Sequence, residues 1–242
     1  MAYRVNYVEP LVEAVLLRRY KRFLADIRLP DGSEVTAHCA NSGRMTACWE
    51  PGVRCRVSFH DKPKRKLKWS LQQTCMGGTW VMVNTALPNR VVEEGIKAGR
   101  VAELSGWPIV EREKKLGESR IDLRLRDDNV THWVEVKNVT LVEGGRARFP
   151  DAVSVRATKH LGELVRAVQA GDHATLFFHV GRADCDVVGP ADDVDPVYGQ
   201  ALRRAVEAGV GVLAYRCDVG LRDLALAERL PIDLSPAHIQ GR

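Results

Sequence analysis

Hydrophobic and polar residues alternate with a period of two through the first third of the chain. The alternation is clearest over residues 11–17, 22–29, 34–39, 53–59, 67–74 and 79–83. Successive side chains of a strand point to opposite faces, so this pattern predicts strands with one buried face. Asp31-Gly32 lies between two of these segments and predicts a hairpin turn. We therefore expect an all-β N-terminal domain.

The number and length of these strands predict a small barrel that is closed or partly closed. Five or so short strands occur within the first 85 residues, and the oligonucleotide-binding (OB) barrel is the commonest barrel of that size. Pro88-Asn89 marks the end of the alternation. We therefore assign residues 1–86 to an OB-like barrel.

Beyond Pro88 the hydrophobic period changes from two to three or four. Residues 91–104, 154–170 and 195–208 have apolar positions at helical spacing, and the first of these helices is expected to end at Gly106-Trp107-Pro108. Strands are predicted over residues 109–116, 121–125, 133–137, 174–180 and 210–215, with an edge strand after Leu221. We expect residues 87–242 to form an α/β domain, a mixed sheet flanked by helices.

Basic residues are concentrated in the first domain. The chain has 36 Lys and Arg against 31 Asp and Glu, a net charge of +5. Residues 1–85 contain 14 of the basic and 7 of the acidic residues, so this third alone carries an excess of +7. Such an excess predicts an anionic partner. No run of 18 apolar residues is present, so we expect no membrane span.

Six cysteines are present, none of them in a C-x-x-C pair, and the chain has no signal-peptide pattern. We expect reduced thiols in a cytoplasmic protein. Cys39, Cys48, Cys55 and Cys75 are close together in the sequence, so a zinc site is one interpretation. Their spacing favours the other interpretation, small buried side chains in a barrel.

Two short segments of the barrel combine cations with aromatic residues. Cations bind phosphates and release counterions, and an aromatic ring stacks on a base. We therefore predict that both segments bind nucleic acid, with a solvated, solubilising loop as the alternative. The candidate residues are Arg18, Arg19, Tyr20, Lys21, Arg22, Lys64, Arg65, Lys66, Lys68 and Trp69.

The predicted hairpin of the second domain carries two carboxylates and a lysine. Glu135 and Lys137 point to the same face of one strand, and Asp122 lies on the preceding strand. Carboxylate oxygens suit a hard divalent metal, and a lysine beside it can orient or activate a water. The structural alternative is a surface ion pair between Glu135 and Lys137, with Asp122 paired to Arg124.

This order of elements and acids resembles the PD-(D/E)xK nuclease fold, a restriction-endonuclease-like sheet, over about residues 88–216. The resemblance implies that Asp122 and Glu135 bind Mg²⁺ or Mn²⁺. It also implies that Lys137 helps to activate the attacking water.

Members of that superfamily often add an acid from the preceding helix and a polar or basic residue from the following helix. For the acid we prefer Glu94 to Glu103. For the second position Lys159 or His160 fits.

Three other polar features are predicted to be structural. Asn41-Ser42-Gly43 predicts a tight turn, and Asp151 after Pro150 is expected to be a turn residue, with a role in the site as the alternative. His179 lies on an apolar strand and is expected to be a satisfied core histidine.

A longer series of motifs occurs in order along nearly the whole chain, at residues 19–23, 41–45, 119–122, 135–137, 149–152, 159–161, 190–192 and 195–198. Together these motifs resemble the sugar fermentation stimulation protein family, SfsA. Where we expect threonine after Asn41 this chain has Ser42, which keeps the hydroxyl. The resemblance implies a bacterial DNA-binding protein with an OB-like first domain and a nuclease-like second domain, linked to the regulation of sugar utilisation.

We therefore expect a protein that binds DNA, or alternatively RNA, and has a Mg²⁺-dependent phosphodiesterase site. One rival is a non-catalytic DNA-binding regulator that retains the nuclease-like fold. Another is an enzyme acting on a small phosphorylated metabolite. The sequence leaves the oligomeric state open, including a homodimer.

Overall fold

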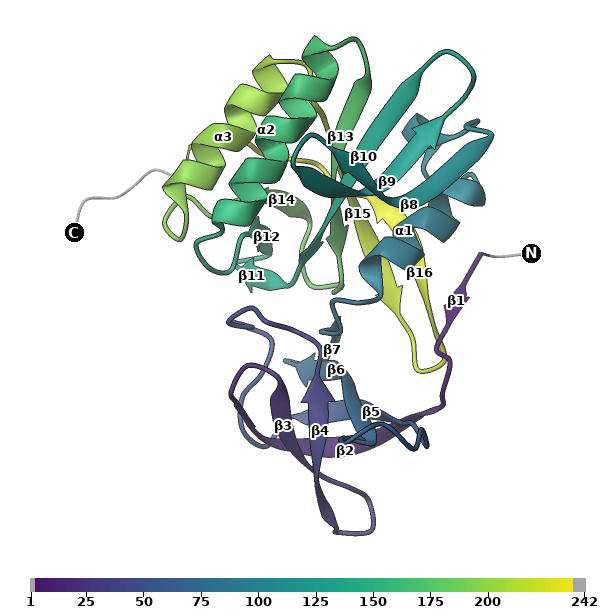
Figure 1. Ribbon diagram of the computed structural model, residues 1–242. Helices are drawn as coiled ribbons and strands as arrows, with labels where there is room; N and C mark the ends of the chain where they lie inside the picture. Colours follow the sequence, from purple (N-terminus) through teal and green to yellow (C-terminus); the bar gives the residue numbers. More distant parts are fainter. Residues whose placement is uncertain (1–2, 237–242) are drawn as a thin grey trace, which may run out of the picture.

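The computed structural model describes residues 3–236 and shows a barrel below a larger sheet domain (Figure 1). The barrel sheet has the strand order β4-β3-β2-β5-β6-β7, and β4 also pairs with β6 in parallel, which closes the barrel. This is the OB-like barrel expected from the alternating pattern. Its strands are β2 (Leu11–Tyr20), β3 (Leu24–Arg28), β4 (Glu34–Cys39), β5 (Arg54–Phe59), β6 (Trp69–Met76) and β7 (Thr79–Met82).

The second domain is built on a seven-stranded mixed sheet with the order β1-β16-β15-β13-β10-β9-β8. The central strands β10, β13 and β15 are parallel, and the outer pairings are antiparallel. The sheet strands are β1 (Val5–Asn6), β8 (Ile109–Leu116), β9 (Ser119–Arg126), β10 (Thr131–Val139), β13 (His173–Val180), β15 (Gly211–Val219) and β16 (Asp223–Arg229). A small second sheet contains β11 (Leu141–Glu143), β12 (Arg146–Phe149) and β14 (Val187–Pro190).

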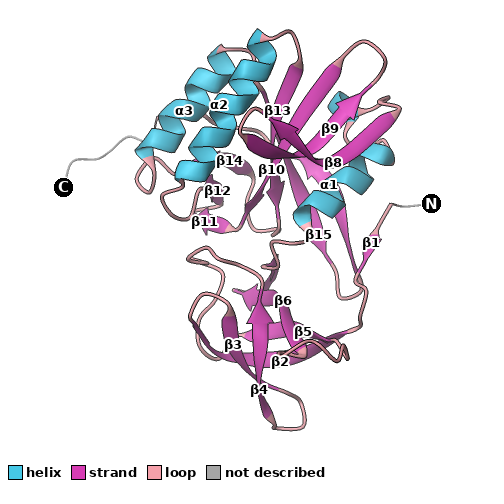
Figure 2. Cartoon of the chain, in the orientation of Figure 1, coloured by secondary structure: helices cyan, strands magenta, loops and turns pink. Residues whose placement is uncertain are grey.

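Helices cover both faces of the seven-stranded sheet (Figure 2). Helix α1 (Pro88–Lys97) packs Val91 and Val92 into one buried cluster. Helices α2 (Val155–Gln169) and α3 (Pro196–Glu207) pack Leu161 and Leu202 into the cluster on the other face. Burial of two separate apolar clusters fixes the sheet between the helix layers.

The two domains are joined by direct hydrogen bonds. The Met82 amide donates to Gly181 O at 2.8 Å, and Arg182 Nη1 donates to Ala47 O at 2.9 Å. Strand β1 pairs with β16, so the chain enters the second domain's sheet before it forms the barrel. The division at residues 86 and 87 stays a prediction.

The strands and helices expected from periodicity are present, with two differences. The first helix ends at Lys97 and is followed only by a short 3-10 turn at Ala102–Leu104, because Gly99 takes a positive φ of 69° and the Arg100 amide turns back to Gly95 O. The short strands β1, β11, β12 and β14 were not predicted, because two to four residues carry too little periodicity to recognise.

All six cysteines are buried and unpaired, in agreement with small core side chains. None of the helices described between residues 3 and 236 has the length and apolar character that a membrane crossing requires.

We expect acid to destabilise the protein partly through His132 on β10. Burial, together with the nearby His173, lowers the pKa of His132 to about 4, and its Nε2 contacts Thr175 Oγ1 at 2.8 Å. The unfolded chain takes up a proton near pH 6.5 and the folded chain does not, so stability falls as the pH drops from about 6.5 to 4, by roughly 3 kcal/mol in total. Urea unfolding across this range should show a shallower pH dependence in His132→Gln.

The variant His173→Gln is the control for that measurement. It should retain most of the pH dependence, because burial of His132 remains. Equal slopes for wild type and His132→Gln would contradict the assignment.

Candidate active site

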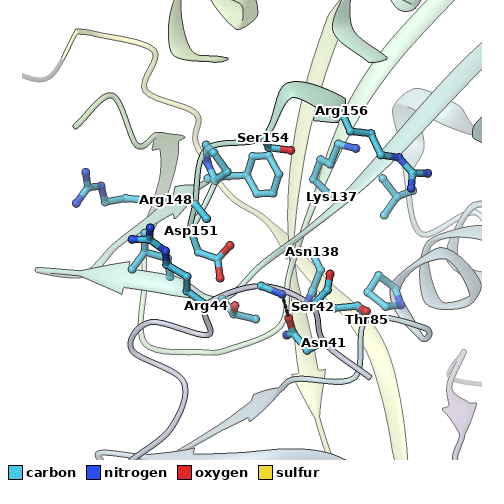
Figure 3. A pocket seen from close by; sticks show the side chains of 18 of the residues that line it. Asn41, Ser42, Arg44, Thr85, Lys137, Asn138, Arg148, Asp151, Ser154 and Arg156 are labelled. Carbon is cyan, nitrogen blue, oxygen red and sulfur yellow. Dashed lines mark hydrogen bonds between the residues drawn. The ribbon is translucent and has the colours of Figure 1, made fainter. Parts of the chain in front are cut away.

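A cleft of about 910 Å³ lies between the barrel and the second domain (Figure 3). The barrel contributes Arg19, Arg22 and residues 41–44. The second domain contributes Asp122 of β9 and residues 135–138 of β10. It also contributes residues 148–154, which lead from β12 to α2, and Arg156 in the first turn of α2. Asp122, Glu135 and Lys137 all line this cleft, so the structure brings the three sequence-predicted residues together.

Asp122 lies where strands β9 and β10 separate. Their antiparallel pairing runs from Thr131–Arg126 to Val134–Leu123 and ends there. The Val136 amide donates instead to Asp122 Oδ2 at 2.8 Å. The other carboxylate oxygen, Oδ1, accepts from Asn89 Nδ2 of α1 at 2.7 Å. The split between the strands therefore exposes a fixed carboxylate to the cleft.

Glu135 is the most buried of the acidic residues in the cleft, with 2% of its surface exposed. Its Oε1 atom contacts both Lys137 Nζ and His160 Nδ1, each at 2.5 Å. Its Oε2 atom is buried and has no hydrogen-bond partner among the described residues. A buried carboxylate oxygen without a partner is costly, and a bound cation or water would satisfy it.

His160 has a defined tautomer in this arrangement. Arg156 Nε donates to His160 Nε2 at 3.4 Å, so Nε2 acts as an acceptor. The ring proton then lies on Nδ1, which donates to Glu135 Oε1. His160 therefore fixes the Oε1 atom of Glu135 by a hydrogen bond and leaves the Oε2 atom without a partner.

The two carboxylates influence each other's ionisation. Burial raises the pKa of Asp122 to about 6, and the negative charge of Glu135 adds to the rise. Burial also opposes ionisation of Glu135, but the hydrogen bonds and charges of His160 and Lys137 outweigh it and hold the pKa of Glu135 below its usual range. Close acidic oxygens of this kind are the donors that a hard divalent cation takes.

The donor set is small. Within residues 3–236 no group of three or more His, Cys, Asp and Glu side chains is arranged to hold a metal. The residues that could hold one are Asp122 and Glu135, and the unpartnered Glu135 Oε2 fits that role.

Comparisons with known proteins agree with this architecture. Residues 17–83 match the model of the SfsA N-terminal OB domain, and residues 86–223 match that of the sugar fermentation stimulation protein RE domain. The chain belongs to the SfsA family. It is 52% identical over 224 residues to a sugar fermentation stimulation protein homolog from Geobacter sulfurreducens, covering 92% of this chain and 96% of the relative.

Two further relatives cover nearly the whole chain. A homolog from Thioalkalivibrio sulfidiphilus is 52% identical over 236 residues, covering 96% of this chain and all of the relative. The structure of Pyrococcus furiosus SfsA in complex with Ca²⁺ is similar with a TM-score of 0.87 at 27% identity, covering 96% of this chain and 99% of that one.

The additional acid proposed from α1 does not reach the cleft of this SfsA-family protein. Glu94 is on the helix surface and pairs with Lys97 at 3.9 Å, and Glu103 accepts from Tyr215 Oη at 2.7 Å. Helix α1 contributes the side-chain amide of Asn89 instead, which donates to Asp122. In the sequence the Pro88-Asn89 pair indicated only a domain boundary.

The two candidates from α2 differ. His160 contacts Glu135, whereas Lys159 pairs with Glu118 at 3.1 Å and does not line the cleft. The structural alternative for Asp122 is wrong, because Arg124 bonds Glu111. His179 is buried as expected of a core histidine, but it is only half satisfied. Its Nδ1 lies 3.0 Å from Asn138 Oδ1, whereas its buried Nε2 has no hydrogen-bond partner among residues 3–236.

The basic candidates are divided between the cleft and other surfaces. Arg19 and Arg22 line the cleft, and Arg19 Nη2 donates to the carbonyls of Arg22, Asn41 and Gly43. Neither Lys21 nor the loop at residues 60–68 lines it.

Several of the remaining basic candidates have local partners. Arg18 bonds Asp26 and lies over the Tyr20 ring, and Lys68 bonds Asp61. Trp69 packs against Phe59. Arg65 bonds the Ser70 hydroxyl. A nucleic-acid role for these residues, and for Lys21, Lys64 and Lys66, stays a prediction.

The loop at residues 41–45 is fixed to the second domain by Asp151, for which the sequence favoured a turn over a role in the site. Asp151 Oδ2 accepts from the Met45 amide at 3.0 Å. Asn41 Oδ1 accepts from the Gly43 amide at 2.9 Å (Figure 3). A Cβ atom on Gly43 would lie 2.8 Å from Asp151 Oδ2 and 3.1 Å from Asn41 Oδ1. Only glycine allows this close approach of the barrel loop to the carboxylate.

The substitution Gly43→Ala should therefore destabilise the protein by about 1–2 kcal/mol, because the added methyl group displaces the Asp151 carboxylate from the Met45 amide. Denaturant unfolding measures this change. The matched control is Gly162→Ala within α2, where the nearest atom is Arg166 Nη1 at 3.8 Å. That substitution should stabilise by about 0.5–1 kcal/mol through helix propensity. A stabilising effect at both positions would contradict the close contact.

Proposed function

We propose that this SfsA-family protein is a divalent-metal-dependent phosphodiesterase that acts on nucleic acid. The observation that carries the proposal is the buried, unpartnered Glu135 Oε2 beside Asp122 and Lys137, in an open cleft. Two comparisons support it: a nuclease-like RE domain covers these residues, and the Pyrococcus relative was solved with Ca²⁺. In this protein Mg²⁺ or Mn²⁺ is the proposed ion.

Asp122 and Glu135 are the residues that would hold the metal. A bound divalent cation supplies charge stabilisation for a phosphate and lowers the pKa of a bound water. The protein's own contribution is to fix the carboxylates in place. The Val136 amide and Asn89 orient Asp122, and His160 orients Glu135.

Lys137 is the proposed group that positions the attacking water. Its ammonium lies 2.5 Å from Glu135 Oε1, and only 14% of the side chain is exposed. A partly buried ammonium can donate to a water or to a phosphate oxygen, and it stabilises negative charge that develops there.

The charges of the cleft suit a polyanion. Arg19, Arg22 and Arg44 line it from the barrel, and Arg148 and Arg156 line it from the second domain. Cations distributed along a groove bind a phosphate backbone and make the binding dependent on salt. DNA is the proposed substrate, and RNA is the alternative that the experiments below also test. Asp122, Glu135 and Lys137 all come from one chain, so the three residues meet without a second copy of the protein. A homodimer stays a prediction.

A non-catalytic nucleic-acid-binding regulator is the second candidate. The observation that favours it is the close pairing of Lys137 with Glu135, which stabilises both charges without a metal. Relatives are named as sugar fermentation stimulation protein homologs, and either candidate could act in the regulation of sugar utilisation. The two are separated by whether the site binds metal and turns over.

Metal binding should be lost when Asp122 is replaced. Calorimetric titration of the wild type with Mn²⁺ or Ca²⁺ should show a binding site that is absent from Asp122→Asn, because one of the two carboxylates is removed. The control Asp127→Asn removes a carboxylate from the exposed hairpin turn and should bind as the wild type does. Equal heats of metal binding for wild type and Asp122→Asn would contradict a metal site at Asp122.

Cleavage should require Lys137. With Mg²⁺ or Mn²⁺ present, Lys137→Ala should reduce the rate of cleavage of labelled DNA or RNA by about 100-fold or more, the usual effect of losing a proton-transfer or charge-stabilising group. The control Lys159→Ala, which lies outside the cleft, should stay within about twofold of the wild type. If wild type and Lys137→Ala both fail to cut any of these substrates, the phosphodiesterase is rejected.

A further inference from the structure

The cations of the cleft are not equally available to a ligand. Arg148 is engaged by Glu143 and Asp193, and Arg19 is engaged by backbone carbonyls. Arg22 and Arg44 are exposed, and among residues 3–236 no carboxylate lies within ion-pair distance of either. These two guanidinium groups are therefore free to bind phosphates from the barrel side.

The second domain presents its own cations across the cavity. Figure 3 shows Lys137 and Arg156 on one side of the cleft and Arg44 on the other. Arg156 is exposed, and the only hydrogen bond that its side chain makes within residues 3–236 is the one to His160. A phosphate backbone that passes between these groups would be neutralised from both sides.

The size of the cleft restricts the form of nucleic acid that can enter. Its volume of about 910 Å³ is in the range of pockets for drug-sized ligands. A duplex is much larger, since its major groove alone is about 12 Å wide. The cleft cannot widen freely, because the Met45–Asp151 and Ala47–Arg182 hydrogen bonds join its two walls.

An exposed aromatic residue, Phe23, follows Arg22 in the chain. The Phe23 side chain is 46% exposed, and its ring stacks on His38 with centroids 6.4 Å apart and an interplanar angle of 15°. His38 in turn lines a separate hollow of about 380 Å³ with Arg65 and Leu67. An exposed ring on a polar surface suits the face of an unpaired base, which a duplex does not offer.

We propose that the cleft accepts a single-stranded polynucleotide, which crosses the barrel over Phe23 and His38 and enters the cleft at Arg22 and Arg44. The strand's bases stack at Phe23, and its phosphates bind the two arginines before reaching Lys137. This inference rests on the proposed function only for the position of the phosphate that is cut.

Binding without cleavage tests the inference. Fluorescence anisotropy is measured in EDTA with labelled single strands of about 12 nucleotides, as DNA and as RNA, and with the matching blunt duplex. The wild type should bind a single strand at least tenfold more tightly than the duplex. A preference between the DNA and RNA strands identifies which polymer is the ligand. Equal or tighter binding of the duplex would overturn the inference.

Substitutions locate the path of the strand. The double variant Arg22→Gln, Arg44→Gln should weaken single-strand binding at least tenfold and reduce the slope of log K against log salt by about 1.4, since each phosphate contact contributes about 0.7. The matched control is Lys115→Gln, Arg120→Gln on the β8–β9 hairpin, two exposed cations away from both hollows. If both double variants lose affinity equally, the path is wrong.

Phe23→Leu separates stacking from apolar burial. Leucine keeps an apolar side chain but has no aromatic face, so single-strand affinity should fall about fivefold or more. The control Phe59→Leu alters another exposed phenylalanine of the barrel, 41% exposed, that packs on Trp69. Thermal melting of each variant confirms that the fold is kept. If Phe59→Leu loses as much single-strand affinity as Phe23→Leu, the proposed stacking of bases on Phe23 is contradicted.

Failure of this inference differs from failure of the proposed function. If single strands bind through Arg22 and Arg44 but are not cut with Mn²⁺, the strand path stands and the phosphodiesterase is rejected. If duplexes are cut through Lys137 while single strands neither bind nor are cut, the phosphodiesterase stands and the strand path is rejected.

Discussion

The arrangement of the site depends on two acidic side chains that are kept close together away from water. Burial disfavours a charged carboxylate, and a second carboxylate nearby disfavours it further, which together raise the pKa of Asp122 to about 6. The protein offsets this cost at one oxygen of Glu135 but not at the other. Glu135 has an ammonium and an imidazole on one oxygen, whereas its other oxygen has no partner among the described residues. The arrangement is therefore satisfied on the protein side and incomplete on the cleft side, as expected of a site that binds a cation.

The same constraint explains the local backbone. Had β9 and β10 stayed paired past Val134, the Val136 amide would have bonded to backbone, and the Asp122 carboxylate would lack that donor. Separation of the strands at this point gives the carboxylate a backbone donor and opens a gap at the sheet. The barrel loop at residues 41–45 lies over that gap and is held there by Asp151. The cleft is thus a product of both domains, and neither alone would enclose it.

The sequence predicts the elements of this fold well and the site only in part. Long alternating or helical segments such as β2 and α2 follow directly from burial on one face. Asp122, Glu135 and Lys137 could be placed together because they lie on the two adjacent strands of one hairpin, just past the last paired residues, Val134 and Leu123. Asn89 and Asp151 could not be found in that way. Asn89 is 33 residues from its partner Asp122, and Asp151 is 106 residues from its partner Met45. Only tertiary packing determines contacts over such separations. Glu94 was expected in the site only because members of the superfamily often add an acid from the preceding helix, whereas in this chain its carboxylate lies 3.9 Å from the ammonium of Lys97.

The basic residues show why charge in a sequence does not by itself locate a binding surface. Arg19 and Arg22 belong to one short cluster but have different roles. Arg19 donates to the backbone carbonyls of four residues, Arg22, Asn41, Gly43 and Arg44, and so holds the 41–44 loop in shape, while Arg22 is left exposed at the cleft. A guanidinium with five donors in a fixed plane suits the first role better than an ammonium would. Because Arg19 fixes the loop that carries Arg44, the half-buried cation determines where the exposed one can meet a phosphate.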